Sequence, residues 1–308
     1  MNKYIITNFI LILSTVLCAQ TNDYFENEAF ITWQKNKLRK AKTETRSAYD
    51  MPYDRVDRTI SITAHISIIN GDTLMSESAI RQNIDGVNRL FAPTGFTFKV
   101  CNFNYFHGIA YDTVSHYPKN ENAEELMRKN YAPNTINIYF SNNLQSSGGD
   151  LVGGLAPMPY DDIKNNPDTR GEKKQQDDWV KIAAGYRNNP LLAKVIAHEL
   201  GHYFGLFHPH EEGAFGSEYA EDRSLCASTG DLICDTPAEP TLTDLVESCL
   251  YIGNLEPSTA LRDPAGKVYM PSVTNIMSYS PDECKYGFSE QQFDRMLMIY
   301  NVFRTYLR

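Results

Sequence analysis

The chain has 308 residues, a length that gives room for one large or two modest domains with a sizeable core. Acidic residues outnumber basic ones by 38 to 29, which gives a formal net charge of −9. The one local group of basic residues, within 35–42, is best explained as a solvated helix ahead of the folded domain. We therefore expect no nucleic-acid partner, because binding nucleic acid requires a basic surface.

Residues 1–19 have the features of a signal peptide. Lys3 supplies the positive start, an apolar run follows, and cleavage after Ala19 fits the small-residue rule. The run is too short for a comfortable membrane span, and no other stretch is long and apolar enough to cross a bilayer. Lipoprotein processing at Cys18 is the less favoured alternative, because Leu17 is bulky where a small residue is usual. We expect a secreted or periplasmic protein with no stable membrane insertion.

Residues 20–57 are polar and form either an N-terminal extension or a short pro-segment, and residues 58–308 are expected to form the folded domain. Residues 59–68 alternate apolar and polar side chains, so we expect a strand with one buried face. Ser76 is placed to cap a helix whose apolar residues recur at helical spacing. Further strands are expected at 96–103 and 135–140, with a short helix between them at 121–129.

The second half of the chain has less regular patterning. The Gly-rich stretch 146–157 suits an edge strand or a flexible loop, and the highly polar residues 161–178 suit a surface insertion. A last strand at 179–184 precedes a helix that opens with the apolar run 191–197, and a helix at 289–307 ends the chain. This order predicts an α+β fold in which a mixed, twisted sheet packs on helices.

The strongest chemical signal is the stretch His-Glu-Leu-Gly-His-Tyr-Phe-Gly-Leu-Phe-His. On a helix, His198 and His202 lie one turn apart on the same face and can hold one metal ion. Glu199 points elsewhere, so it is better placed to polarise a water than to bind the metal. Gly205 can take a positive φ, end the helix and turn the chain toward His208. Three neutral nitrogen ligands with a fourth position for water are typical of a catalytic zinc.

The apolar run before this motif disfavours the alternative of two ordinary histidines on a polar surface helix. The extended motif is the signature of the metzincin metallopeptidases, and Asn-Ile-Met-Ser-Tyr at 275–279 resembles their Met-turn. Within that clan the chain resembles the pappalysin family in three blocks, at 198–208, 230–237 and 275–296. Pro209 is more typical of serralysins, but the Gly/Asp-rich repeats of serralysins do not occur in the sequence.

The resemblance implies a metzincin-type fold. It places a twisted, mixed five-stranded sheet with backing and active-site helices in an upper subdomain, 58–205, over an irregular, disulfide-linked lower subdomain, 206–308. It favours an edge strand within 146–157, antiparallel to an extended bound substrate. It also favours His208 over His210 as the third zinc ligand.

The resemblance also implies roles for single residues. Glu199 is the general base, which takes a proton from a zinc-activated water and delivers it to the leaving amine. Tyr279 hydrogen-bonds the tetrahedral intermediate, with a packing aromatic as its alternative, and Met277 is an apolar floor. Asp282 matches a position where some bacterial pappalysins carry an acid at the base of the S1′ pocket. That match implies cleavage before Arg or Lys, whereas the alternative for Asp282 is an exposed loop carboxylate.

Five cysteines remain after the leader, and export makes disulfides possible. Four of them follow the zinc motif and allow three pairings, among which spacing does not choose. The resemblance implies Cys226–Cys249 and Cys234–Cys284. Cys101 lies in a strand-like run and is expected to be a buried free thiol.

The expected function is that of a secreted zinc metalloendopeptidase acting on protein or peptide substrates. Its alternatives are a serralysin-like enzyme of broad specificity, a zinc amidase of cell-wall peptides, and an inactive protease-fold binding module. The Met-turn segment disfavours the amidase, and the intact Glu199 and three His disfavour the inactive module. Four acidic residues suit either a calcium site or solvated loops: Glu221, Asp222, Asp231 and Asp235.

Overall fold

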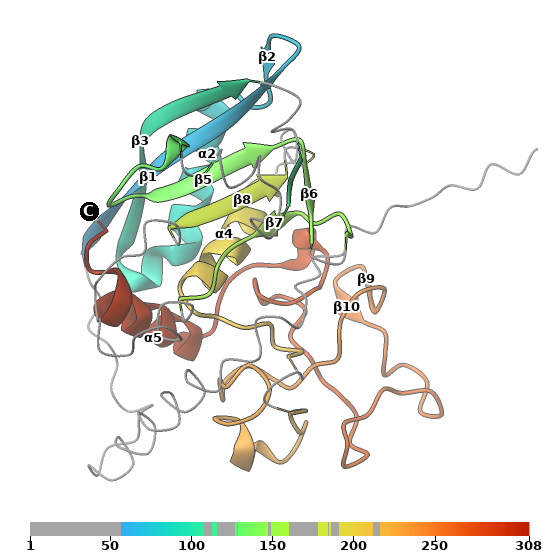
Figure 1. Cartoon of the computed structure of the whole chain (residues 1–308). Coiled ribbons are helices and arrows are strands. Elements are labelled where there is room, and N and C mark those ends of the chain that lie inside the picture. Colours follow the sequence, from blue (N-terminus) through green and yellow to red (C-terminus); the bar gives the residue numbers. More distant parts are fainter. Residues whose placement is uncertain are drawn as a thin grey trace, which may run out of the picture.

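The computed structural model describes residues 57–107, 113–115, 127, 129–146, 149–159, 178–183, 185, 191–211 and 216–307. Figure 1 shows a twisted sheet with helices packed behind it, and a largely irregular region below. The predicted signal peptide and polar segment lie outside the described residues, as do nearly all of the short helix expected at 121–129 and of the insertion expected at 161–178.

One mixed sheet forms the upper half of the molecule (Figure 1). Its strands are β1 (Arg58–Ile69), β2 (Asp72–Thr73), β3 (Phe96–His107), β5 (Ile136–Ser141), β7 (Gly154–Leu155) and β8 (Trp179–Ala183). The main strands lie in the order β3-β1-β5-β8-β7, and β2 is a two-residue return that pairs with the end of β1. All main pairings are parallel except β7 with β8, which is antiparallel. The α+β prediction is confirmed, with the short β2 added to the five expected strands.

Strand β1 is buried on both faces, so the expectation of one buried face is wrong. Its apolar residues, such as Ile62, face the helices, and its polar residues are buried on the other side. There His65 stacks on Tyr139 of β5, with ring centroids 4.2 Å apart, and its Nε2 lies 2.9 Å from Asn137 Oδ1. Cross-strand hydrogen bonds of this kind satisfy the polar groups, which makes their burial possible.

Helix α2 (Glu77–Phe91) begins as predicted, because the Ser76 side chain accepts a hydrogen bond from the Ala79 N–H at 3.2 Å. It packs against α4 (Leu192–Tyr203) at Gly86, where an added Cβ would lie 2.6 Å from the Ala193 Cβ. The 3-10 turn η2 (Ala92–Thr94) and Gly95, with φ +78°, then return the chain to β3. Both helices contribute to one apolar core with the inner face of the sheet.

The region after α4 contains only short elements until the last helix. They are η5 (Arg223–Leu225), β9 (Val246–Glu247), β10 (Leu250–Tyr251), η6 (Asp282–Cys284), α5 (Glu290–Ile299) and the π-helical turn η7 (Tyr300–Arg304). Two further short strands come before α4 in the sequence, and they pair with each other beside the main sheet. They are β4 (Thr113–Ser115) and β6 (Asn143–Gln145). The predicted C-terminal helix starts at its capping Ser289 but leaves the α-helical geometry after residue 299.

The disulfide prediction is wrong. The bonds are Cys226–Cys234 and Cys249–Cys284. The first closes an eight-residue loop that folds back on itself, and the second ties the β9–β10 hairpin to η6. Because the loop returns close to its own start, the nearest partner of Cys226 in space is also its neighbour in sequence.

Cys101 is a free cysteine, as predicted, but it is exposed where a buried thiol was expected. The pairing of β1 with β3 shifts register here, since Ile62 pairs with Val100 and Thr63 pairs with Asn102. Cys101 is therefore the extra residue of a β-bulge, and a bulge changes which face of the sheet a side chain occupies.

Candidate metal centre and active site

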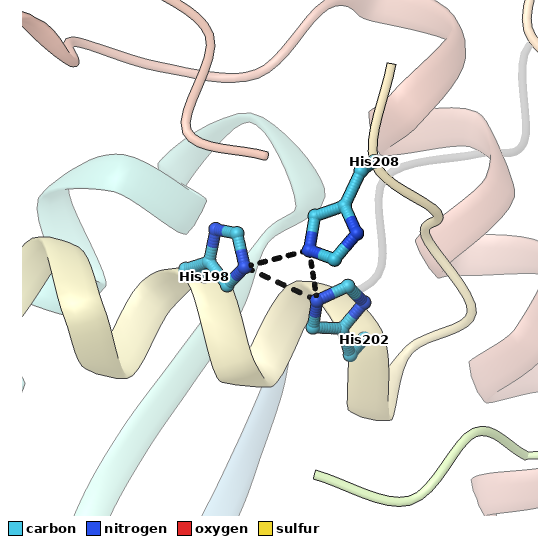
Figure 2. Close-up of side chains that lie close together, drawn as sticks. All are labelled: His198, His202 and His208. Atoms are coloured by element: carbon cyan, nitrogen blue, oxygen red, sulfur yellow. Dashed lines mark hydrogen bonds between the residues drawn. The ribbon is translucent and has the colours of Figure 1, made fainter. Parts of the chain in front are cut away.

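Helix α4 carries His198 and His202 on one face, and its end brings the third histidine back to them. Gly205 has a φ of +86°, its N–H donates to His202 O at 2.8 Å, and Leu206 N–H donates to Gly201 O at 2.9 Å. These two bonds form a Schellman motif, which ends the helix and reverses the chain. His208 thereby lies beside the other two rings (Figure 2), as the sequence predicted.

The three imidazoles are buried and point their Nε2 atoms at one another. The Nε2 separations are 3.1 Å for His198–His202, 3.2 Å for His198–His208 and 3.0 Å for His202–His208. Nδ1 of His198 and of His202 each lie 2.8 Å from a backbone carbonyl oxygen, of Ile276 and Leu206 respectively. A carbonyl only accepts, so these Nδ1 atoms carry the proton and their Nε2 atoms present lone pairs.

This arrangement fits a zinc ion. Zinc–nitrogen bonds of about 2.0–2.1 Å at tetrahedral angles hold nitrogens about 3.3 Å apart, close to the observed spacing. Burial lowers the pKa of His202 to about 4 and the pKa of His198 and His208 well below the usual value, so all three rings are neutral at pH 7. Among the described residues, these three form the one cluster of His, Cys, Asp and Glu side chains with metal-ligand spacing.

Glu199 is fully buried and lies against the edge strand β7. A Cβ added at Gly154 would lie only 2.5–2.7 Å from the Glu199 side chain, including 2.6 Å from Oε1. Gly154 is therefore the residue that allows the carboxylate to lie beside the strand. The edge-strand prediction for 146–157 is confirmed at Gly154–Leu155, which pair antiparallel with β8.

Met277 lies beneath the metal centre, directly against α4. It is fully buried, and a Cβ at Gly201 would overlap its sulfur atom. The turn that carries it is held by Ile276 N–H donating to Gly287 O at 2.8 Å and by Ser278 Oγ donating to Glu239 Oε1 at 2.8 Å. Met277 therefore packs against the helix residue that directly precedes His202.

Tyr279 is partly buried, and its ring lies against His208 and His210, with centroids 4.6 and 4.3 Å apart. His210 stacks on His208 at 5.0 Å, and its Nδ1 lies 3.7 Å from Glu239 Oε1. His210 is outside the cluster of metal-ligand spacing, in agreement with the preference for His208.

Asp282 begins η6, and its carboxylate is already paired. Lys285 Nζ donates to Asp282 Oδ1 at 2.8 Å. Lys194 Nζ, from the first turn of α4, donates to the backbone carbonyls of Asp282 and Glu283 at 2.8 and 3.2 Å. Asp282 therefore contacts α4 at Lys194, which lies one helical turn before His198. Its carboxylate is paired with Lys285, a residue for which the sequence had predicted no role.

The four acidic residues considered for calcium do not converge. Asp231 accepts from Thr236 Oγ1 at 2.9 Å and from Ile233 N–H at 3.0 Å, and Asp235 accepts from Ser289 Oγ and Gln291 N–H. Asp222 caps η5, and the exposed Glu221 pairs with Lys267. The structure gives no support to a calcium site at these four residues.

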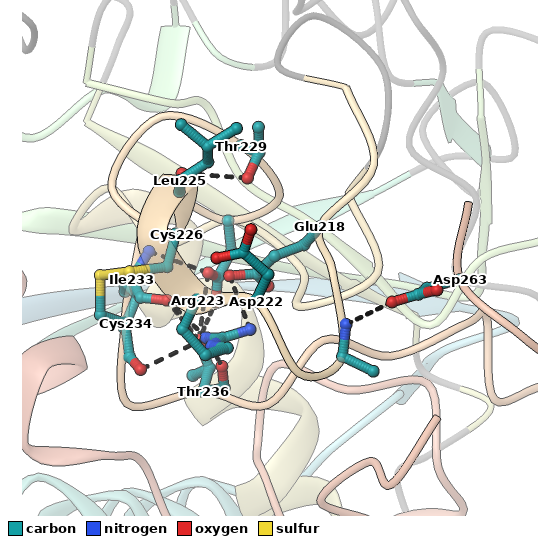
Figure 3. Close-up of polar contacts among 12 residues, drawn as sticks. Glu218, Asp222, Arg223, Leu225, Cys226, Thr229, Ile233, Cys234, Thr236 and Asp263 are labelled. Carbon is teal, nitrogen blue, oxygen red and sulfur yellow. Dashed lines mark hydrogen bonds and ion pairs between the residues drawn. A yellow bond between two sulfur atoms is a disulfide. The ribbon is translucent and has the colours of Figure 1, made fainter. Parts of the chain in front are cut away.

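Arg223 holds this part of the lower region together (Figure 3). Its guanidinium pairs with Glu218 at 2.8 Å and donates to the carbonyls of Ile233, Cys234 and Thr236. The buried Glu218 follows the motif by ten residues, and no spacing in the sequence indicated this contact.

Sequence reasoning missed three residues of the site: Gly154, Glu239 and Lys285. Gly154 lies in the predicted edge-strand segment, but the side chain it faces, Glu199, is distant in sequence. Lys285 lies in the block at 275–296, and its pairing with Asp282 and its burial follow from the folded turn. Glu239 lies two residues after the Asp-Thr-Pro segment, and its pairing with Ser278 could have been suspected only from the two blocks lying close in space.

Comparison with known proteins agrees with this geometry. The family model described as pregnancy-associated plasma protein-A, peptidase M43, matches residues 120–301. An extracellular metalloprotease of Arthroderma gypseum is 24% identical over 306 residues, which covers 94% of this chain and 87% of that protein.

Two solved structures from Tannerella forsythia share the fold. A promirolysin mutant matches with a TM-score of 0.56 at 17% identity, covering 90% of each chain. Mature mirolysin in complex with a cleaved peptide matches with a TM-score of 0.53 at 18% identity, covering 80% of this chain and 92% of that one. Within the described residues, no helix has the length and apolar character that a membrane crossing requires.

Proposed function

This chain belongs to the pregnancy-associated plasma protein-A family of zinc metalloproteases, and we propose that it is a secreted endopeptidase with Glu199 as its general base. The observation that carries this proposal is the convergence of three buried, neutral histidines beside a buried glutamate. We assign His198, His202 and His208 as the zinc ligands.

Zinc at this place, when bound, supplies a Lewis acid that makes a water molecule more acidic and polarises a peptide carbonyl. Glu199 accepts the proton of the attacking water on its carboxylate and delivers it to the nitrogen of the leaving amine. Burial beside β7 keeps this carboxylate in one position, so little reorganisation is needed at the moment of reaction.

Two residues of the Met-turn support the chemistry in different ways. The Tyr279 hydroxyl donates a hydrogen bond to the oxyanion that develops on the substrate, a role supported by the place of its ring beside His208. Met277 supplies an apolar surface against which α4 packs at Gly201, and it takes no part in proton transfer.

The substrate is an extended peptide that pairs with the edge strand β7, because the antiparallel pairing of β7 with β8 leaves β7 at the end of the sheet. Mature mirolysin has been solved with a cleaved peptide, which supports a peptide substrate here as well. Asp282 is the counter-charge for a basic residue at P1′, the position directly after the cleaved bond, so cleavage before Arg or Lys is expected.

The remaining assignments concern the chain outside the site. Residues 1–19 are a signal peptide, with lipoprotein processing at Cys18 as the less favoured route, and the name of the Arthroderma relative supports export. Residues 20–57 are an N-terminal extension or a short pro-segment that precedes the catalytic domain, 58–308. Residues 58–205 form its upper subdomain and residues 206–308 its lower one, with the metal centre between them.

The test is a peptide-library digest read by mass spectrometry. Zinc-loaded wild type should cleave internal bonds before Arg or Lys, and cleavage should vanish with a chelator. Glu199→Gln keeps the size of the side chain but removes the base, so kcat should fall by roughly 10²–10⁴-fold with zinc still bound. An active Glu199→Gln variant would refute the assignment of the base, and an inactive zinc-loaded wild type would favour the binding-module alternative.

A further inference from the structure

Lys285 is a buried lysine on the chain that leaves the Met277 turn. Its side chain is only 8% exposed, against 20% for the paired Asp282, and the two charged groups are 2.8 Å apart. A buried ammonium is strongly unfavourable without a counter-charge, and Asp282 is the carboxylate in direct contact with it. The pair uses one carboxylate oxygen, Oδ1.

The turn that carries this pair is fixed to the metal centre at both ends. At one end, Ile276 accepts from His198 through its carbonyl and donates to Gly287 O. At the other, Lys194, four residues before His198 on α4, binds the backbone carbonyl of Asp282 at 2.8 Å.

This arrangement has a consequence for substrates with a basic P1′ side chain. A carboxylate that already has an internal cation attracts a second cation more weakly than an unpaired one does. A guanidinium can still compete, because it binds a carboxylate through two parallel hydrogen bonds, whereas an ammonium binds as a point charge. Arg should therefore displace Lys285 from Asp282 more readily than a substrate Lys does.

We propose that Lys285 is a specificity-determining residue whose ammonium competes with the substrate's P1′ side chain for Asp282. The enzyme then prefers basic P1′ residues less strongly than it would with an unpaired Asp282, and among basic residues it prefers Arg to Lys. The inference rests on the proposed endopeptidase function and names the residue that sets its selectivity.

The experiment measures kcat/KM for two peptides that differ only at P1′, one with Arg and one with citrulline, its neutral counterpart of nearly equal shape. The ratio of the two values isolates the charge. Lys285→Gln removes the cation but keeps an N–H donor for Asp282, and we expect it to raise the ratio by about fivefold. Lys285→Arg keeps the cation and can pair with Asp282 through two hydrogen bonds, so the ratio should not rise above that of wild type.

Asp282→Asn supplies the second arm. Combined with Lys285→Gln it should bring the ratio near one, and alone it should bring the ratio to one or below, because the Lys285 cation then remains without the carboxylate. A changed stability alone would alter both peptides equally and would leave the ratio in place. Lys285→Met, which has no donor, repeats the test if Lys285→Gln does not fold.

Three results would overturn the inference while leaving the endopeptidase intact: a ratio unchanged in both neutral variants of Lys285, a ratio that falls in them, or a ratio in Asp282→Asn equal to that of wild type. Failure of zinc-loaded wild type to cleave either peptide, or any member of the peptide library, would instead refute the proposed function itself.

Discussion

The residues before and after Gly205 are held together by different means. From 58 to 205, regular strands and helices bury a continuous apolar core, with Ile62, Ile138, Val87 and Ile196 among its members. After Gly205, the Met277 turn and α5 join this core, but much of the remaining chain is irregular and is fixed by two disulfides and by arginines that bind backbone carbonyls. The metal centre takes two ligands from the first region and one from the second, so it depends on both kinds of stabilisation.

The difference shows in how α5 is attached to the chain below it. Arg295 donates to the carbonyls of Asp231 and Leu232, at 2.9 and 2.6 Å, and Asp235 accepts from the first turn of the helix. A carboxylate at a helix N-terminus also meets the positive end of the helix dipole. Single contacts of this kind each fix a loop, whereas the apolar core distributes its stabilisation over many side chains.

The largest effect is expected where a buried ion pair joins the two regions. Asp178, just before β8, pairs with Arg304 at 2.8 Å and accepts from Tyr203 at the end of the zinc helix. Asp178→Asn leaves the buried guanidinium without its counter-charge and should lower the free energy of unfolding by about 3–5 kcal/mol, measured by urea denaturation. The double variant with Arg304→Met should recover much of this loss, and a loss below about 1 kcal/mol would contradict the account.

The two disulfides should differ in their contribution to stability. Loop-closure entropy predicts about 4 kcal/mol for Cys249–Cys284, which spans 35 residues, and about 2.5 kcal/mol for Cys226–Cys234, which spans eight. Serine substitutions of each pair, compared by denaturation, check the order. Peptide mapping without reduction checks the pairing, and Cys226–Cys249 or Cys234–Cys284 cross-links would restore the pattern implied by the family resemblance.

Gly154→Ala should affect catalysis more than stability. The added methyl group meets the Glu199 side chain and must displace it, so we expect kcat to fall by roughly 10²-fold, the lower part of the range for losing a general base. KM and zinc content should change little. Gly185→Ala is the matched control, because nothing lies within 4 Å of the position of its Cβ. An unchanged kcat in Gly154→Ala would show that Glu199 is not held against β7.

The smallest expected effect is a pH dependence in the lower region. Burial raises the pKa of Asp231 to about 7, partly offset by Arg295 and Thr236, with the acidic Glu239 and Glu218 also nearby. The folded state therefore binds the proton more tightly than the unfolded state. This group's contribution to stability is greatest below its ordinary pKa of 3.8 and is lost as the pH rises to about 7.

Asp231→Asn removes this titration. The fall in the free energy of unfolding between pH 4 and pH 7 should become smaller by on the order of 2 kcal/mol, measured by denaturation at a series of pH values. The Thr236 hydroxyl can still donate to the new amide oxygen, so the fold should persist. A pH dependence equal to that of wild type would show that Asp231 is ionised throughout this range.

The comparison of regions also explains what the sequence could predict. The capped helix at Ser76 and the strands on either side follow periodic patterns, and the zinc motif with its Gly205 turn is local, so each was predictable from neighbouring residues. The burial of Asp178, placed at the end of a polar insertion by sequence reasoning, depends on Arg304, which lies 126 residues away.

The disulfide pairing failed for the same reason. No local pattern fixes the path of an irregular chain, so spacing left Cys226 with three candidate partners, and the pairing with Cys249 rested on the family resemblance alone. Lys285 likewise gave no signal, because its significance comes from burial beside Asp282 and from the nearness of α4. The sequence alone does not predict residues whose position depends on a single contact with a distant part of the chain, and only the structure reveals them.

The most direct test of the central claim is the zinc content of purified protein, measured by atomic emission together with peptide cleavage. We predict one zinc per chain in wild type and in Glu199→Gln, with cleavage only in wild type. His208→Gln, which removes the ligand supplied by the irregular region, should lose both the zinc and the activity. A full zinc content with activity in His208→Gln would contradict the account, because the metal would then be held without the chain beyond Gly205.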